Sequence, residues 1–164
     1  METKPVSSKL YGLIVLYEMH TDFLIRALDG IEEKDAENRM DTKANHIAWI
    51  TGSVISGRYH LAKSFGIDLP SSTGELFKDN KGIIDDQAYP KLEDFKKDWQ
   101  KISPPLLAAL TNATDEKLEE AYEMPGMKMT LFEMISFTIY REANCIGQIV
   151  LWRRLLGYAG MNYM

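Results

Sequence analysis

Cysteine is almost absent from this sequence. Cys145 is the only one among 164 residues, so an internal disulfide is excluded. No stretch approaches the ~20 apolar residues needed to span a bilayer. The first residues also lack the charged and then apolar order of a signal peptide. We therefore expect a cytoplasmic protein that has no membrane partner.

Positive charge is scarce as well. The chain has 19 Lys and Arg against 24 Asp and Glu, which gives a formal net charge of -5. Because nucleic-acid phosphates are bound by clustered Lys and Arg, this balance argues against a nucleic-acid partner. P-loop, dinucleotide-binding, nucleophile-elbow and paired-cysteine motifs are all missing. The common routes to nucleotide chemistry and hydrolysis therefore have no support in the sequence.

Helical periodicity is what the sequence does contain. Apolar residues recur at three- and four-residue spacing over four segments, residues 8–28, 41–65, 90–110 and 130–156. No segment shows the sustained alternation of a strand. Four long amphipathic helices in a chain of this length predict an all-α four-helix bundle that forms a single domain over residues 1–164.

Local signals mark the ends of these helices. Gly30 suits the left-handed position after a helix end. Thr130 and Glu133 have the spacing of a capping box, in which each side chain accepts a hydrogen bond from the other's backbone N–H. Asp41 or Thr42 is expected to start the second helix, and the adjacent Pro104 and Pro105 predict a kink in the third. A short further helix is expected over 115–122.

The longest irregular stretch, residues 66–89, joins the second helix to the third. It contains Pro70, Gly74 and Gly82 and few periodic apolar residues. A loop of this length in a compact domain is often a lid or a binding loop. A plain surface connection is the alternative interpretation.

Two passages resemble the DinB-like family, also called DinB/YfiT, of four-helix bundles. They are residues 45–53 (NHIAWITGS) and residues 130–157, of which 146–149 (IGQI) and 153–157 (RRLLG) are the most specific parts. The resemblance implies the family's bundle, with a long loop between helices two and three, and pairing into homodimers through bundle helices. In metal-binding relatives, it implies one histidine on helix two and an i, i+4 histidine pair on helix four. Relatives of that kind include thiol-dependent S-transferases and isomerases.

This sequence departs from that metal-binding pattern. Ser53 stands where the helix-two ligand is expected, and Arg141 and Cys145 stand where the helix-four pair is expected. A serine hydroxyl is a poor ligand for such metals, and arginine is a permanent cation that donates hydrogen bonds but does not ligate. We therefore expect a degenerate metal site, with no metal and no cofactor, in which these three side chains line a common cavity.

Each of these residues has two interpretations. Arg141 is either paired internally with a carboxylate such as Glu18 or Asp22, or it is a clamp for an anionic ligand. Cys145 is either a small core residue or a thiol that the nearby arginine activates. The histidines are the remaining candidate ligands: His46 and His60 lie seven residues on either side of Ser53, roughly 10 Å away along the helix, too far to share an ion. His20 lies on the first helix.

Two functional hypotheses remain. The first is a non-catalytic bundle, a homodimer that binds a small anionic or apolar molecule. The second is an enzyme, a metal-dependent hydrolase or thiol S-transferase relative. The set Ser53, Arg141 and Cys145 favours the first. The dimer surface is predicted from apolar residues near the C-terminus, namely Tyr158, Met161, Tyr163 and Met164.

Overall fold

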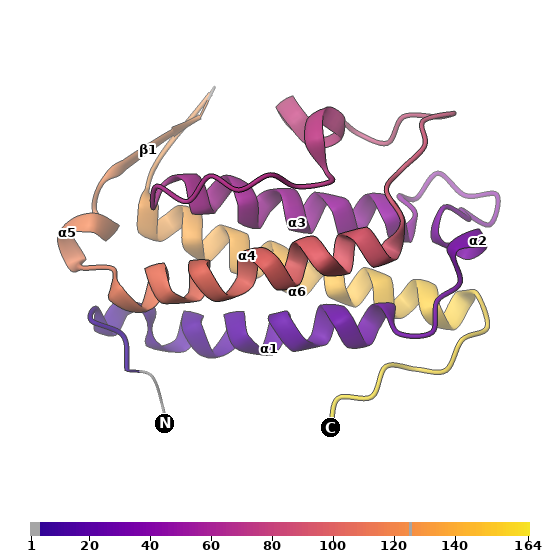
Figure 1. Cartoon of the computed structure of the whole chain (residues 1–164), viewed down its shortest axis with the longest axis horizontal. Helices are drawn as coiled ribbons and strands as arrows, with labels where there is room; N and C mark the ends of the chain where they lie inside the picture. The colour runs from indigo at the N-terminus through magenta and orange to yellow at the C-terminus, as the bar shows by residue number, and fades with distance from the viewer. Residues whose placement is uncertain (1–3, 125) are drawn as a thin grey trace.

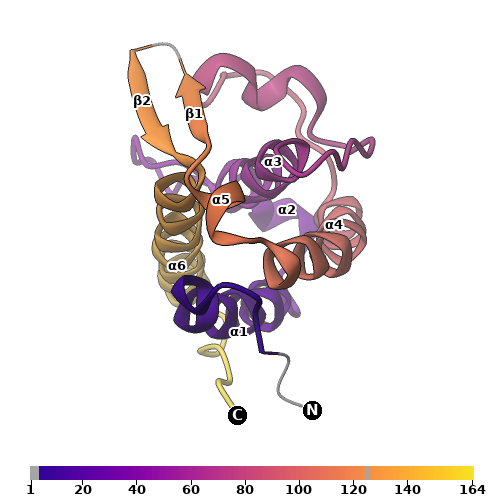
Figure 2. The same ribbon diagram turned by 90° about the vertical axis from the view of Figure 1, so that its left-hand side faces the viewer.

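Four long helices lie along one another in the computed structural model, which describes residues 4–124 and 126–164 (Figure 1). They are α1 (Tyr11–Leu28), α3 (Ile47–Lys63), α4 (Leu92–Asn112) and α6 (Leu131–Leu155). Both α1 and α3 pack against α4 and α6, so each helix has two neighbours around a shared core (Figure 2). The predicted all-α four-helix architecture is confirmed.

Each helix buries the apolar stripe that predicted it. On α4, Phe95, Trp99, Ile102 and Leu106 are fully buried, and the other three helices contribute comparable rows to the same core. Burial of such side chains stabilises the fold by roughly 1.5–3 kcal/mol each. None of the helices in the described part of the chain is long and apolar enough to cross a membrane.

Short elements fill the connections. They are the 3-10 helices η1 (Ser8–Leu10) and η2 (Gly74–Asn80) and the α-helical turns α2 (Glu33–Ala36) and α5 (Asp115–Leu118). The last of these ends four residues before the predicted end of the short helix. The loop predicted over 66–89 is confirmed as the connection between α3 and α4, although η2 lies within it.

A β-hairpin follows α5, and the prediction that the chain contains no strand is wrong here. Strand β1 (Ala121–Met124) pairs antiparallel with β2 (Met127–Thr130), and Figure 2 shows the hairpin extending beyond the helices. Gly126, in the turn, has a φ of +79°. Strands of four residues are too short for their alternation to stand out in the sequence.

Most of the predicted helix ends are correct. Thr130 and Glu133 form the capping box that begins α6, and Gly30, just beyond α1, has a φ of +71°. The second long helix, however, begins at Ile47 rather than at Asp41 or Thr42. Asp41 has a φ of +57°, which a right-handed helix excludes, and the His46 side chain caps the helix instead.

The third helix, α4, runs without interruption through Pro104 and Pro105. The kink expected at these residues stays a prediction.

Candidate functional site

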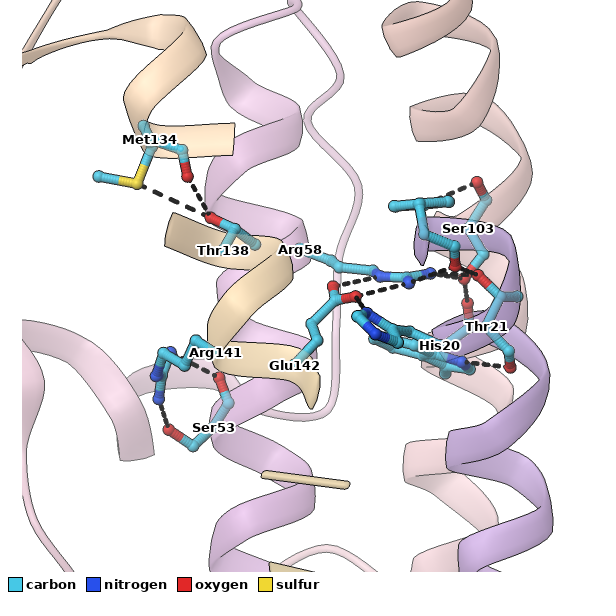
Figure 3. A network of polar contacts seen from close by, with 11 residues as sticks. His20, Thr21, Ser53, Arg58, Ser103, Met134, Thr138, Arg141 and Glu142 are labelled. Carbon is cyan, nitrogen blue, oxygen red and sulfur yellow. Dashed lines mark hydrogen bonds and ion pairs between the residues drawn. The ribbon is translucent and has the colours of Figure 1, made fainter. Parts of the chain in front are cut away.

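The centre of the bundle contains a buried ion pair between Arg58 of α3 and Glu142 of α6. The guanidinium donates through Nε to Oε1 of Glu142 at 2.6 Å and through Nη2 to Oε2 at 2.9 Å (Figure 3). It also donates through Nη1 to the hydroxyls of Thr21 and Ser103, at 2.8 and 2.7 Å, and through Nη2 to the Tyr17 carbonyl at 3.3 Å. All five N–H groups of this arginine therefore have acceptors.

Two aromatic rings enclose the same guanidinium. Its Cζ atom lies 3.7 Å from the ring centroid of Tyr17 and 3.5 Å from that of Trp99, a cation–π arrangement on both faces. The rings are themselves fixed, because the Tyr17 hydroxyl donates to the Ser103 carbonyl and the Trp99 indole donates to the Thr21 carbonyl. Residues of α1, α3, α4 and α6 thus meet at one buried cation.

His20 of α1 completes this network. Its Nδ1 lies 3.2 Å from Oε2 of Glu142 and, facing a carboxylate, is the protonated ring nitrogen. Burial alone raises the pKa of Glu142, but the charge of Arg58 and the hydrogen bonds from Arg58 and His20 outweigh it. The net result is a pKa below the ordinary value, so Glu142 is ionised.

Two of the three residues predicted from the sequence, Ser53 of α3 and Arg141 of α6, are in contact. Arg141 donates through Nη2 to the Ser53 hydroxyl, with a longer contact of 3.5 Å from Nη1 to the Ser53 carbonyl (Figure 3). Its guanidinium lies over Gly57, where an added Cβ would be 3.5 Å from Nη1. The structure therefore brings Ser53 and Arg141 together.

Arg141 has no carboxylate partner in the part of the chain that the structure describes. The pairing with Glu18 or Asp22 considered from the sequence is therefore wrong, and Asp22 forms an ion pair with Arg26 one helical turn away at 2.7 Å. The arginine that is buried and paired with a carboxylate is Arg58. Arg141 is half-buried, and its charge remains available on one side.

Cys145, one turn after Arg141, is buried and only 7% exposed. Burial raises the pKa of its thiol above the ordinary value, and the charge of Arg141 offsets only part of this effect. The nearby charge of Glu142 raises the pKa further. The thiol is therefore protonated at neutral pH, which fits a core residue better than a nucleophile.

The remaining histidines lie apart from this site. His46 is buried, and its Nδ1 accepts a hydrogen bond from the Trp49 backbone N–H at 3.0 Å. His60 is exposed, with its ring 6.1 Å from that of Tyr122 in the hairpin. Among the described residues, no group of three or more His, Cys, Asp or Glu side chains could hold a metal ion.

The side chains of the predicted set do not fit a divalent metal. The Ser53 hydroxyl accepts a hydrogen bond from a guanidinium, and that guanidinium has no lone pair to give. The one remaining candidate ligand, the Cys145 thiol, is kept protonated by its burial. The chemistry that this arrangement supports is hydrogen bonding to an anion rather than ligation of a cation.

Two surface hollows, of about 390 and 380 Å³, lie elsewhere. The first is lined by Glu37, Arg39, His46 and residues 83–88, and the second by Ile25, Arg26, Asp29, Arg153 and residues 160–162. Neither is lined by Ser53, Arg141 or Cys145, so a cavity shared by those three residues stays a prediction.

No family model matches the chain, and no curated protein is similar to it in sequence. Among solved structures, the crystal structure of a DinB-like protein, YjoA of Bacillus subtilis, has a similar fold. The TM-score is 0.63 at 12% sequence identity, and the match covers 92% of this chain and 96% of that chain. The chain has the DinB-like fold, which confirms the resemblance seen in its sequence.

Replacing Glu142 by Gln is expected to lower the free energy of unfolding by about 3–5 kcal/mol, because the charge of Arg58 is left buried without a counter-ion. Urea denaturation measures the loss. Glu18→Gln, at an exposed position of α1, is the matched control and should change little. The double variant Arg58→Met, Glu142→Leu should lose less than Glu142→Gln alone. A double variant less stable than Glu142→Gln would contradict this explanation.

Stability should also fall as His46 becomes protonated. Burial lowers its pKa to about 4, with a smaller contribution from the charge of Arg39. In the unfolded chain the pKa is about 6.5. The stabilisation is therefore complete above pH 6.5 and is lost progressively as the pH falls towards 4.

His46→Asn keeps a capping side chain without the titration. Its melting temperature should depend less steeply on pH between 6.5 and 4 than that of the parent, in thermal unfolding followed by circular dichroism. Parallel curves for the two proteins across this range would show that His46 does not carry the effect.

Proposed function

We propose that this chain, which has the DinB-like fold, is a non-catalytic bundle without a metal that binds a small anionic ligand through Arg141. The observation that carries the proposal is the Arg141–Ser53 contact. Two of the five guanidinium N–H groups face Ser53, and the other three have no acceptor among the described residues, which leaves them for a ligand. Carboxylate and phosphate are the groups that such a fork binds with paired hydrogen bonds.

The neighbouring side chains support binding over catalysis. A nucleophile needs either a lowered pKa or an adjacent base. Burial raises the pKa of the Cys145 thiol, and the Ser53 hydroxyl is hydrogen-bonded to a cation rather than to a base. Glu142, the nearest carboxylate along the chain, is bound to Arg58 and His20.

The anion site is tested by titrating the protein with sodium acetate and with phosphate, followed by ¹⁵N–¹H NMR. We expect one-to-one binding, with shifts centred on residues 53, 57 and 141, and its loss in Arg141→Gln because the fork is removed. Arg154→Gln removes an exposed arginine of the same helix and should bind as the parent does. If both variants lost anion binding equally, binding would depend on overall positive charge rather than on Arg141, and the proposal would be contradicted.

Calorimetry with zinc and nickel tests the competing interpretation, a metal-dependent hydrolase or thiol S-transferase relative. The parent is expected to show no tight binding. The triple variant Ser53→His, Arg141→His, Cys145→His is expected to bind if these positions correspond to the family's ligands. Tight one-to-one binding by the parent would overturn the non-catalytic proposal.

Assembly into a homodimer is the second part of the proposal, and we revise the surface expected for it. Met161 is buried, and the Tyr158 hydroxyl donates to the Asp35 carboxylate. Tyr163 and Met164 remain exposed, with the ring of Tyr163 against that of Phe23 on α1. Because the C-terminal segment packs against α1, we include α1 in the proposed dimer contact surface.

We define the α1–α6 face as the outward surface of these two adjacent helices. Its large side chains are 42–66% exposed, and small residues lie between them. Between residues 134 and 152, the only charged residues of α6 are Arg141 and Glu142, which are engaged with α3. An uncharged surface of this kind can pack against the same surface of a second copy of the chain. The face comprises Gly12, Val15, Leu16 and Met19 of α1 and Tyr140, Ala143, Gly147 and Leu151 of α6.

Light scattering is expected to give twice the chain mass of 18.7 kDa at micromolar concentration. Leu151→Glu should shift the protein to monomer, because it places a charge in the α1–α6 face. Met127→Glu, at a hairpin residue that is 54% exposed, is the matched control and should leave the dimer intact. A parent mass of 18.7 kDa at every concentration would contradict the dimer.

A further inference from the structure

The ring of Phe77, in η2, lies directly against the backbone of α3 at Gly52. An added Cβ at Gly52 would be 2.9 Å from the Phe95 ring and closer still to that of Phe77. The Phe77 ring also contacts Trp49, at 5.9 Å between centroids, and Tyr89, at 6.1 Å. Gly52 thus makes room on the surface of α3 for one flat aromatic ring, and Phe77 fills it.

Trp49, beside this ring, has an unmet hydrogen-bonding requirement. Its Nε1 is buried and has no acceptor among the described residues. A buried donor that is left unpaired destabilises the folded state, so it calls for an explanation. By contrast, the indole N–H groups of Trp99 and Trp152 donate to backbone carbonyls.

The segment that carries Phe77 is anchored at a distance from the ring. Ser72 donates to the Asp98 carboxylate through its backbone N–H, at 2.6 Å, and Lys101 donates to the Pro70 carbonyl at 3.1 Å. The backbone hydrogen bonds described for η2, Leu76 to Thr73 and Lys81 to Lys78, stay within this segment. The ring can therefore leave α3 without breaking helix hydrogen bonds.

Phe77 and the guanidinium of Arg141 contact consecutive residues of α3. Gly52 and Ser53 follow Trp49 by three and four residues, so each is a neighbour of Trp49 on the helix surface, although the two point about 100° apart. Phe77 covers Gly52, and Arg141 donates to Ser53. The ring position at Gly52 and the cation at Ser53 thus flank Trp49, one on each side, and a ligand with an aryl ring and an anionic group on a short linker could reach both.

We propose that Phe77 is an internal occupant of an aryl-binding slot, and that the ligand of this site is an aryl-alkanoate. The ligand's ring takes the place of Phe77 over Gly52, and its carboxylate accepts hydrogen bonds from Arg141 and Ser53. This proposal rests on the anion site proposed above and specifies its ligand class. Because the closed state dominates, the apparent dissociation constant is the intrinsic one divided by the fraction of open slot.

The test compares the parent with Phe77→Ala, using acetate, benzamide and the series phenylacetate, 3-phenylpropionate and 4-phenylbutyrate as probes. Affinities are measured by ¹⁵N–¹H NMR, and the indole N–H signal of Trp49 is assigned with Trp49→Phe. The best aryl-alkanoate is expected to bind Phe77→Ala at least tenfold more tightly than the parent and to shift the Trp49 signal. Acetate should bind both proteins equally, because it does not use the slot.

Two variants serve as controls. Adding Gly52→Ala to Phe77→Ala fills the slot with a methyl group and should remove the gain. Phe77→Leu keeps an apolar side chain without the flat ring and should give a smaller gain, and it replaces Phe77→Ala if that variant does not fold.

The outcomes separate this proposal from the one on which it rests. Acetate binding with no gain for any aryl probe in Phe77→Ala would overturn the slot and leave the anion site in place. Benzamide binding to Phe77→Ala without acetate binding to either protein would overturn the anion site, and with it the aryl-alkanoate class. A tenfold gain that survives Gly52→Ala would place the aryl ring elsewhere and overturn the slot.

Discussion

The bidentate contact between Arg58 and Glu142 is the interaction on which the arrangement of the four helices depends. It lies where α1, α3, α4 and α6 meet, and every N–H of the guanidinium has an acceptor from one of the other three helices. Sliding α3 past α6 by one turn, about 5.4 Å, would leave both charges buried and unpaired. A buried pair of this kind adds little net stability, but only one alignment of the helices satisfies it.

That alignment also determines the surroundings of Arg141. Consecutive residues of a helix point about 100° apart, since 3.6 residues make one turn. With Glu142 directed into the core, Arg141 is directed to the outer edge of α3, where Ser53 lies (Figure 3). Cys145, three residues after Glu142, returns to the buried side. The two arginines thus differ in their hydrogen bonding. Every N–H group of Arg58 has an acceptor, whereas three N–H groups of Arg141 have none among the described residues.

Helical periodicity was enough to predict the bundle, because the buried stripes of all four helices recur at regular spacing. The Arg58–Glu142 ion pair is not among the sequence predictions, because periodicity identifies apolar stripes and does not say which charged residues are buried within them. The sequence does contain a signal of a buried ion pair. Arg58 lies on the same helix face as the apolar residues Val54, Ile55 and Leu61, and Glu142 is one of only two charged residues between 134 and 152. Which arginine takes which carboxylate depends on how the helices meet, and spacing along one helix carries no such information. The hairpin was missed because its strands are only four residues long.

The rigidity of the buried network limits where the candidate site can adapt. Four helices joined at one fully hydrogen-bonded cation cannot shift separately to fit a ligand. In our proposal the part that adapts is the connection between α3 and α4, which carries Phe77 on a short 3-10 helix. The contact of Phe77 with Gly52 joins residues that are 25 positions apart, so no local sequence pattern predicts it. For the site proposed here, ligand preference therefore depends on the connection between α3 and α4, whereas the bundle supplies a fixed cation at its edge.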